Sequence, residues 1–468
     1  MKGRKKYLGK FIFGMVLLLI VAIALLLPHA IAIHKDMKRI HTEEYDTLFM
    51  SMYSTEFYKE SDFMYYRAMD TLRTDYCIPN GKLVRWYFDK VKASGNLVEH
   101  VYLGVDPERT SKEDIVLLLQ ENPDTFFEVV LPYPSIEYWT DMKEEKFAGI
   151  MQTYHIFAEW ILPLENADLY IFGNEEWLVA NPANYEDTFS TNEDVSEFLM
   201  CNMDYLHPYI VSMEKVGEEI EQYYELYRAY QNRTYPNAEG LEILFLGDSI
   251  IGNFTDTLSI PKVVAGHTGA EVYNFGCGGS SAADSNESIP SLTMIADALL
   301  EGKMNDIPQD TAYYEELLRY KEEGEKEAPK MFVINYGLND YFQGLPLYGE
   351  EPYDTSTYEG ALRLVIEKIK KYYPEAQILL MSPHFTNGLN FGKDKSGEAG
   401  GTLAEYAGMV VEVAEQMDVD VLDNFNEMGI TEANWQVYLP DGTHPNEKTR
   451  YLFGSRIIEK IEYRKEGK

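Results

Sequence analysis

A serine, and a histidine with a nearby carboxylate, mark two segments in the second half of the chain. The apolar run 243–246 is followed by Gly247-Asp248-Ser249, and much later Asp441 precedes His444 by three residues. A carboxylate on the same loop can accept the Nδ1–H of a histidine, which fixes the tautomer and leaves Nε2 free to take a proton from a serine. The two segments indicate nucleophilic catalysis, although taken alone Ser249 could be a helix N-cap.

Two further segments offer hydrogen-bond donors. Three glycines stand in Gly276-Cys277-Gly278-Gly279, where the backbone could approach a ligand closely and direct an N–H toward it. Asn339, in the segment 337–340, offers a side-chain amide. Each segment is also ordinary turn material, so neither identifies a site by itself.

A parallel sheet would bring these segments together. Between about 239 and 464, short apolar runs alternate with helical stretches, which predicts a three-layer α/β fold with a parallel sheet covered by helices on both faces. Reactive loops lie beyond the carboxyl ends of the strands in such sheets, and the first three segments follow predicted strands. The predicted strands are 242–246, 271–275, 331–335, 377–381 and 419–422, and the clearest helices are 357–372 and 403–417.

In this order, the segments resemble the four motifs of the SGNH (GDSL-type) hydrolases. GDS stands at 247–249, N-x-G-x-x-G at 274–279, G-x-N-D at 337–340 and D-x-x-H at 441–444. The resemblance covers about residues 239–464 and implies an SGNH/flavodoxin-like fold with carboxylic esterase activity. The one departure is Ile-Ile-Gly after GDS, where the family has leucine.

The resemblance also implies a role for each matching residue. Ser249 is expected to be the nucleophile, His444 the general base and Asp441 the residue that orients the imidazole. The backbone N–H groups of Ser249 and Gly279 and the side chain of Asn339 are expected to form the oxyanion hole. Donors aimed at the developing oxyanion are needed because the tetrahedral intermediate carries negative charge.

Three other residues lie close to these segments. We expect Asp248 to fix the loop at the end of its strand, and His384 to line the substrate side of the site. Cys277 has no basic partner in its segment, which predicts a packed small side chain rather than a nucleophile.

The first 34 residues predict a membrane anchor. Five basic side chains stand within the first ten residues, and the 23 residues 11–33 carry no full charge. About 20 apolar residues cross a bilayer core, and basic residues remain on the cytoplasmic side. We therefore expect a single-pass signal anchor with the rest of the chain outside the cytoplasm. Ala30-Ile31-Ala32 leaves open a cleaved signal peptide, which would export the same part.

The composition excludes several kinds of function. The 468 residues contain 41 Lys and Arg against 77 Asp and Glu, a net charge of −36, which disfavours binding to nucleic acid or anionic lipid. Three cysteines allow at most one disulfide, of which Cys77–Cys201 is one candidate. No CxxC or HExxH motif is present, and nothing in the sequence calls for a metal or an organic cofactor.

Residues 35–238 are expected to form an accessory region outside the cytoplasm. The sequence predicts a helical stalk over 35–85, strands at 101–105, 126–131 and 168–172, and helices at 112–121, 141–160 and 213–230. Turn residues at 232–240 mark the boundary with the catalytic region 239–468. The segment 184–190 is faintly similar to the end of a second SGNH-type unit, with Ser190 in place of the histidine. An unrelated accessory domain is the alternative.

The leading hypothesis is a membrane-anchored serine esterase that acts on small acyl esters or O-acylated, especially O-acetylated, glycans. A polysaccharide O-acyltransferase could use the same catalytic residues, with a sugar hydroxyl in place of water. A non-catalytic envelope-binding scaffold is the alternative from another functional class. The sequence does not indicate an oligomeric state.

Overall fold

The computed structural model describes most of the chain after residue 80 and short pieces before it. The described residues are 38, 47–50, 55–58, 81–95, 98–108, 110–186, 188, 191–192, 195, 198–199, 209–253, 257–285, 289–309, 311–387 and 400–463. The chain divides into two compact units. The first comprises Met1–Ala180 and Tyr185–Asn232, and the second comprises Asn181–Asn184 and Arg233–Lys468.

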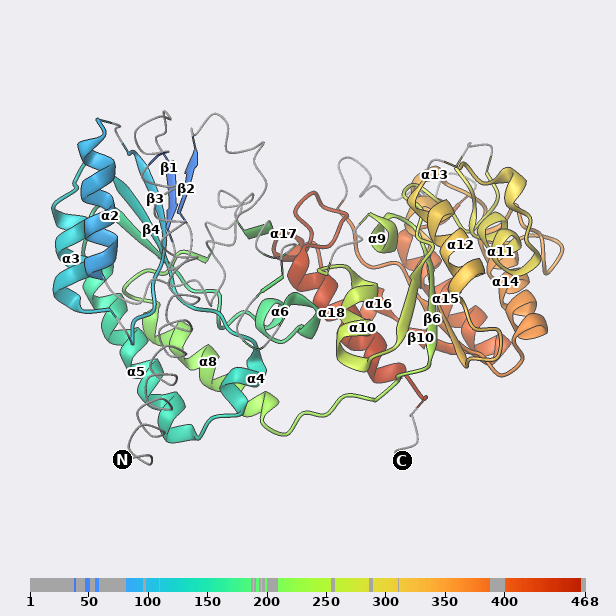
Figure 1. Ribbon diagram of the computed structural model, residues 1–468. Helices are drawn as coiled ribbons and strands as arrows, with labels where there is room; N and C mark the ends of the chain where they lie inside the picture. The colour runs from blue at the N-terminus through green and yellow to red at the C-terminus, as the bar shows by residue number, and fades with distance from the viewer. Residues whose placement is uncertain are drawn as a thin grey trace, which may run out of the picture. The chain divides into compact units, whose positions relative to one another are not determined.

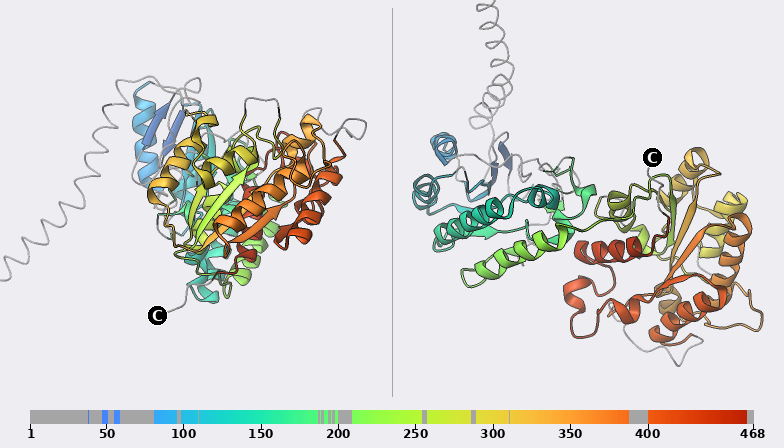
Figure 2. Two further views of the ribbon diagram at one scale, coloured as in Figure 1. Left: turned by 90° about the vertical axis from the view of Figure 1, so that its right-hand side faces the viewer. Right: turned by 90° about the horizontal axis from the view of Figure 1, so that it is seen from below.

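The second unit is built on a five-stranded parallel sheet in the order β10-β9-β8-β6-β7. Its strands are β6 (Glu242–Gly247), β7 (Glu271–Asn274), β8 (Lys330–Asn335), β9 (Gln377–Met381) and β10 (Asp420–Leu422). Its helices are α9 (Ser249–Gly252), α10 (Ile260–Thr268), α11 (Leu292–Glu301), α12 (Ala312–Glu323), α13 (Leu338–Gln343), α14 (Tyr358–Tyr372), α15 (Leu403–Met417), α16 (Asn424–Glu427), α17 (Trp435–Tyr438) and α18 (Glu447–Lys460), with 3-10 turns at η4 (Pro182–Asn184) and η6 (Met304–Asp306). Figures 1 and 2 show the helices around this sheet.

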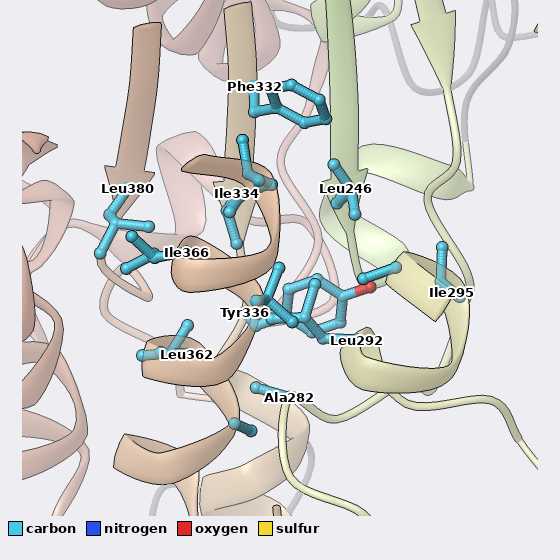
Figure 3. Packing of buried hydrophobic residues seen from close by; sticks show 14 of the residues in the cluster. Leu246, Ala282, Leu292, Ile295, Phe332, Ile334, Tyr336, Leu362, Ile366 and Leu380 are labelled. Carbon is cyan, nitrogen blue, oxygen red and sulfur yellow. The ribbon is translucent and has the colours of Figure 1, made fainter. Parts of the chain in front are cut away.

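Alternating side chains of the strands pack into two separate cores. Leu246, Phe332, Ile334 and Leu380 face α11 and α14, as Figure 3 shows with Leu292, Ile295, Leu362 and Ile366. The intervening residues Phe245, Val333 and Leu379 pack with α10 and α18 on the other face. Because successive side chains of a strand point to opposite faces, a sheet covered on both sides needs apolar residues at nearly every position. The predicted three-layer α/β fold is confirmed for this unit.

The first unit has its own five-stranded sheet, in the order β2-β1-β3-β4-β5. All neighbouring strands are parallel except β2, which pairs antiparallel with β1. The strands are β1 (Thr47–Met50), β2 (Thr55–Tyr58), β3 (His100–Gly104), β4 (Phe126–Val130) and β5 (Ala167–Tyr170). The helices are α2 (Gly81–Ala93), α3 (Lys112–Gln120), α4 (Ile136–Thr140), α5 (Glu144–Ile161), α6 (Glu176–Val179) and α8 (Val216–Tyr230). Counted along the chain, both sheets have the strand order 2-1-3-4-5.

Two expectations for the first unit differ from the structure. The helical stalk predicted over 35–85 is wrong at 47–50 and 55–58, which are strands; Leu48 pairs with Val101 of β3 and so joins the sheet. The helix predicted at 141–160 is present as α5, but it begins at Glu144, three residues later than predicted.

Three other expectations lie outside the described residues. Cys77, Cys201 and Ser190 are not described, and neither is the predicted anchor at 11–33. Within the part of the chain that is described, no helix is both long and apolar enough to cross a membrane.

Candidate active site

Ser249 lies directly beyond the carboxyl end of β6, the strand that lies between β7 and β8 in the sheet. It is the first residue of α9. The preceding residue, Asp248, caps this helix, because its Oδ1 accepts a hydrogen bond from the backbone N–H of Ile250 at 2.9 Å. Asp248 is buried and therefore fixes the turn that presents the serine, which is the loop-fixing role expected from the sequence.

Asp441, His444 and Ser249 form a continuous chain of hydrogen bonds. The Nδ1 of His444 lies 2.6 Å from Oδ2 of Asp441, and its Nε2 lies 2.9 Å from the Oγ of Ser249. Since a carboxylate can only accept, Nδ1 carries the proton and Nε2 accepts from the serine hydroxyl. The structure thus brings together residues 195 positions apart in the sequence, in the tautomer that a general base requires.

Asp441 also fixes the conformation of the loop 441–444, which we call the histidine loop. Its Oδ1 accepts the backbone N–H groups of Thr443 at 2.9 Å and His444 at 2.7 Å. Burial raises the pKa of Asp441, but its hydrogen bonds with His444 and Thr443 outweigh that effect and hold the pKa below its ordinary value. The carboxylate remains ionised beside the imidazole as a result.

The end of the histidine loop is fixed by α18. Asn446 caps this helix by accepting from the N–H of Thr449 at 3.0 Å. The buried guanidinium of Arg450 donates to the carbonyls of Pro445 and Leu258, at 3.0 and 2.9 Å. The loop is therefore tied both to its own helix and to the segment that follows α9.

The glycine-rich turn after β7 faces the serine. A Cβ built on Gly278 would lie 4.0 Å from the Cβ of Ser249. Gly279 has a φ of +80°, a conformation that a side chain strains, and a Cβ there would lie 2.8 Å from Ile289. Among the described residues, no group accepts from the N–H of either Ser249 or Gly279. Both donors are available to a ligand oxygen.

Asn339 stands at the start of α13, beyond β8, and has a second role that the sequence did not indicate. Its Nδ2 donates to the carbonyl of Ser280 at 2.9 Å, which ties α13 to the glycine-rich turn. An amide nitrogen carries two hydrogens, so one N–H remains for a ligand. Asn339 can therefore hold the turn in place and contribute a donor of its own.

Asp340, the residue after Asn339, holds the segment that follows the glycine-rich turn. Its two oxygens accept the backbone N–H groups of Ala282 and Ala283, each at 2.9 Å. Burial raises the pKa of Asp340 to about 6 against the effect of these hydrogen bonds. Burial, with a smaller contribution from the charge of Asp340, raises the pKa of Asp248 to about 7. The sequence marked Asp340 only as turn material, because its backbone partners are distant in the chain.

Two other residues near the site have clear positions. His384 is fully buried and its Nε2 lies 2.9 Å from the carbonyl of Thr443, so the expectation that it lines the substrate side is wrong. It lies against the histidine loop from the protein interior. Cys277 is buried in the apolar core, and burial raises the pKa of its thiol, as expected for a packed side chain. Within the described residues, no group of three or more His, Cys, Asp or Glu could hold a metal ion.

This arrangement can activate a hydroxyl and stabilise an oxyanion. A base within hydrogen-bond distance can take the proton of Ser249 as its oxygen attacks a carbonyl carbon. The N–H donors of the turn follow β7 and that of Asn339 follows β8, so they lie on either side of β6, the strand that precedes the serine.

Comparisons with known proteins agree with this description. Residues 245–449 match the model of the GDSL-like Lipase/Acylhydrolase family. No curated protein matches the chain.

Solved structures are similar to about half of the chain. A protein from Lactobacillus plantarum is 19% identical over 49% of this chain and 97% of its own, with a TM-score of 0.36. A structure described as a possible lipase from Chitinophaga pinensis is 19% identical over 47% and 96%, with a TM-score of 0.32. A member of the lipolytic protein G-D-S-L family from Veillonella parvula is 15% identical over 47% and 98%, also with a TM-score of 0.32.

Proposed function

We propose that the chain is a membrane-anchored serine esterase that removes O-acyl groups from glycans outside the cytoplasm. The match of residues 245–449 to the GDSL-like Lipase/Acylhydrolase family supports the ester-hydrolysing part of this proposal. The observation that carries the catalytic part is the hydrogen-bond chain from Asp441 through His444 to Ser249, at 2.6 and 2.9 Å. These three residues are proposed as the catalytic triad.

The first half of the reaction forms an acyl-enzyme. Nε2 of His444 takes the hydroxyl proton of Ser249 as Oγ bonds to the ester carbonyl carbon, and the carbonyl oxygen becomes an oxyanion. The N–H groups of Ser249 and Gly279 and the side chain of Asn339 donate to that oxygen. Collapse of the intermediate breaks the bond to the alcohol oxygen, which receives the proton from His444.

The second half returns the enzyme to its starting state. Water loses a proton to Nε2 of His444 and attacks the acyl carbon of the ester on Ser249. The second tetrahedral intermediate collapses, the proton passes to Oγ of Ser249, and the carboxylic acid leaves. Asp441 keeps the Nδ1–H of the imidazole in place throughout and stabilises the imidazolium.

The sequence of the first 34 residues supports the location and, through it, the substrate class. A basic leader followed by 23 residues without a full charge is typical of a signal anchor. A chain outside the cytoplasm meets cell-envelope or imported material, which favours O-acyl groups on glycans as the substrate class. The acidic body of the chain suits a neutral or weakly charged substrate better than an anionic one.

Ester hydrolysis by the full-length chain in detergent micelles tests the proposal. The substrates are nitrophenyl acetate, nitrophenyl butyrate and an O-acetylated oligosaccharide. Turnover is expected in the wild type and in Ser212→Ala, whose serine is exposed in the first unit, and is expected to vanish in Ser249→Ala. Hydrolysis that persists in Ser249→Ala would contradict the assignment of the nucleophile.

The same assay separates the rival functions. Transfer of acetyl to an added oligosaccharide, with little release of acetate, would replace the esterase by an O-acyltransferase. Absence of both reactions would favour a binding scaffold. Labelling of the N-terminus and protease protection in membranes then distinguish a retained anchor from a cleaved signal peptide.

A further inference from the structure

The segment that follows β9 holds the backbone of the histidine loop between its two proposed catalytic residues. The Oγ1 of Thr386 and the backbone N–H of Asn387 both donate to the carbonyl of Gly442, at 2.7 and 2.8 Å. Nε2 of His384 lies 2.9 Å from the next carbonyl, that of Thr443. Gly442 and Thr443 are the two residues between Asp441 and His444. We name the residues 384–387 the loop clamp.

The burial of His384 determines how it bonds. A carbonyl only accepts, so Nε2 must carry the proton, and the neutral ring then leaves Nδ1 as a bare acceptor. No group among the described residues bonds to that Nδ1. Protonation would place a second N–H in a buried site without an acceptor, which costs free energy. Burial accordingly lowers the pKa of His384 to about 4, with a smaller contribution from His444.

The neutrality of His384 matters for its neighbours. The charged or titratable groups that act on it are His444 and Asp441 of the histidine loop, while α18 presents the apolar ring of Phe453, with ring centroids 5.5 Å apart. A positive charge on His384 would oppose the imidazolium that His444 forms during each half-reaction. As a neutral donor, His384 holds the loop without that repulsion.

The loop clamp holds the backbone that sets the distance between His444 and Ser249. A displacement of about 1 Å between reacting groups lowers the rate about a hundredfold, and the Nε2 to Oγ distance of 2.9 Å depends on the path of 441–444. Arg450 donates to the carbonyl of Pro445, just after His444, and the Nδ2 of Asn446 donates to the carbonyl of Val437, before Asp441. The two carbonyls between Asp441 and His444 are held by the loop clamp.

We infer that His384 is a positioning residue for the general base, acting with Thr386 through the carbonyls of Gly442 and Thr443. This inference rests on the proposed serine esterase function. His384 lies outside the four SGNH motifs, and in this role it holds His444 in position beside Ser249.

A pair of matched substitutions tests the inference. His384→Gln places an amide donor near the position of Nε2, whereas His384→Asn places it near Nδ1, and both remove the ring from Phe453. We expect His384→Asn to lower kcat about 10- to 100-fold with KM changed less than twofold, and His384→Gln to retain kcat within about fivefold. A purely structural role would lower the melting temperature of both variants and leave kcat per folded molecule unchanged in both.

A second pair guards against a variant that does not fold. Thr386→Ser keeps the hydroxyl and Thr386→Val removes it at nearly constant volume, and Thr386 is also buried. The inference predicts that Thr386→Val lowers kcat about tenfold and that Thr386→Ser restores most of it. Equal kcat in both members of both pairs would overturn the inference.

An activity-independent measurement separates this inference from the proposed function. In protein labelled with nitrogen-15 histidine, the Nδ1 proton of His444 that bonds to Asp441 gives a downfield resonance at low temperature. The resonance should persist in His384→Gln and broaden or disappear in His384→Asn. If the wild type hydrolysed no ester, the esterase proposal would fail while this comparison still decided the positioning role, and an unchanged resonance in both variants would overturn it.

Discussion

Replacing Asn339 by alanine should separate two contributions of one side chain. The amide donates to the carbonyl of Ser280 at 2.9 Å and has a second N–H for the substrate oxygen. A typical internal hydrogen bond contributes about 0.5–1.5 kcal/mol to stability, and the lower half of that range applies because Asn339 is only half-buried. Loss of an oxyanion donor lowers kcat about 100- to 1000-fold, or about 2.7–4 kcal/mol of transition-state stabilisation.

The two contributions are read by different measurements. Denaturant unfolding should show a loss of stability below about 1 kcal/mol, whereas kcat on nitrophenyl acetate should fall at least 100-fold with KM little changed. Asn339→Asp should be less active than Asn339→Ala, because it directs a negative charge at the oxyanion. Asn232→Ala, on an exposed turn, is the control. A decrease in kcat below about threefold in Asn339→Ala would refute the donor role.

Three further substitutions test other parts of the site. Asp441→Asn should lower kcat about 100- to 1000-fold. This decrease is smaller than for a buried triad aspartate, because the side chain of Asp441 is 49% exposed and water can replace part of its effect. A kcat within tenfold of the wild type would contradict this expectation. Gly279→Ala should lower kcat at least tenfold, since alanine strains a φ of +80°, and unchanged kcat would show that this N–H is not used. Burial raises the pKa of Asp248 to about 7, so the folded state binds this proton more tightly than the unfolded state. The free energy of unfolding therefore falls as pH rises from about 4 to 7. Asp248→Asn can still accept from Ile250, and its free energy of unfolding should vary less over that range by about 1–3 kcal/mol; equal pH dependence in both proteins would contradict the effect of burial.

The sequence predicted the second unit well because its signals are local. The three inner strands, β6, β8 and β9, contain continuous apolar runs, and both cores draw on alternate residues of the same runs, such as Phe245 and Leu246. The helix predicted at 403–417 has the bounds of α15, which begins with the capping pair Thr402 and Glu405. These features depend on neighbouring residues alone, so they can be read without a structure.

The parts of the site that the sequence missed depend on long-range contacts. Asp340 bonds to backbone N–H groups 57 and 58 positions away, and His384 bonds to a carbonyl 59 positions away. In the sequence, an aspartate after an asparagine is typical of a turn, and a lone histidine at a strand end predicts an exposed side chain. The contacts of these two side chains depend on where β8 and β9 lie in the sheet, which the local sequence does not indicate.

The first unit shows a different limit. Its β1 and β2 are four residues each, too short for their apolar spacing to distinguish strand from helix. The shared strand order of the two sheets supports the hypothesis that this unit is a second, degenerate copy of the same architecture. The sheets differ in the pairing of the second strand, because β2 is antiparallel to β1 whereas β7 is parallel to β6.

In the proposed reaction, Ser249 becomes acylated with His444 as its base. The direct measurement is peptide mapping by mass spectrometry after acid quenching of the full-length protein with nitrophenyl acetate, or after reaction with a fluorophosphonate. We expect a single stoichiometric adduct on Ser249 that is absent in Ser249→Ala and forms at least 1000-fold more slowly in His444→Ala. An adduct on another residue, or rapid labelling of Ser249 without His444, would contradict this mechanism.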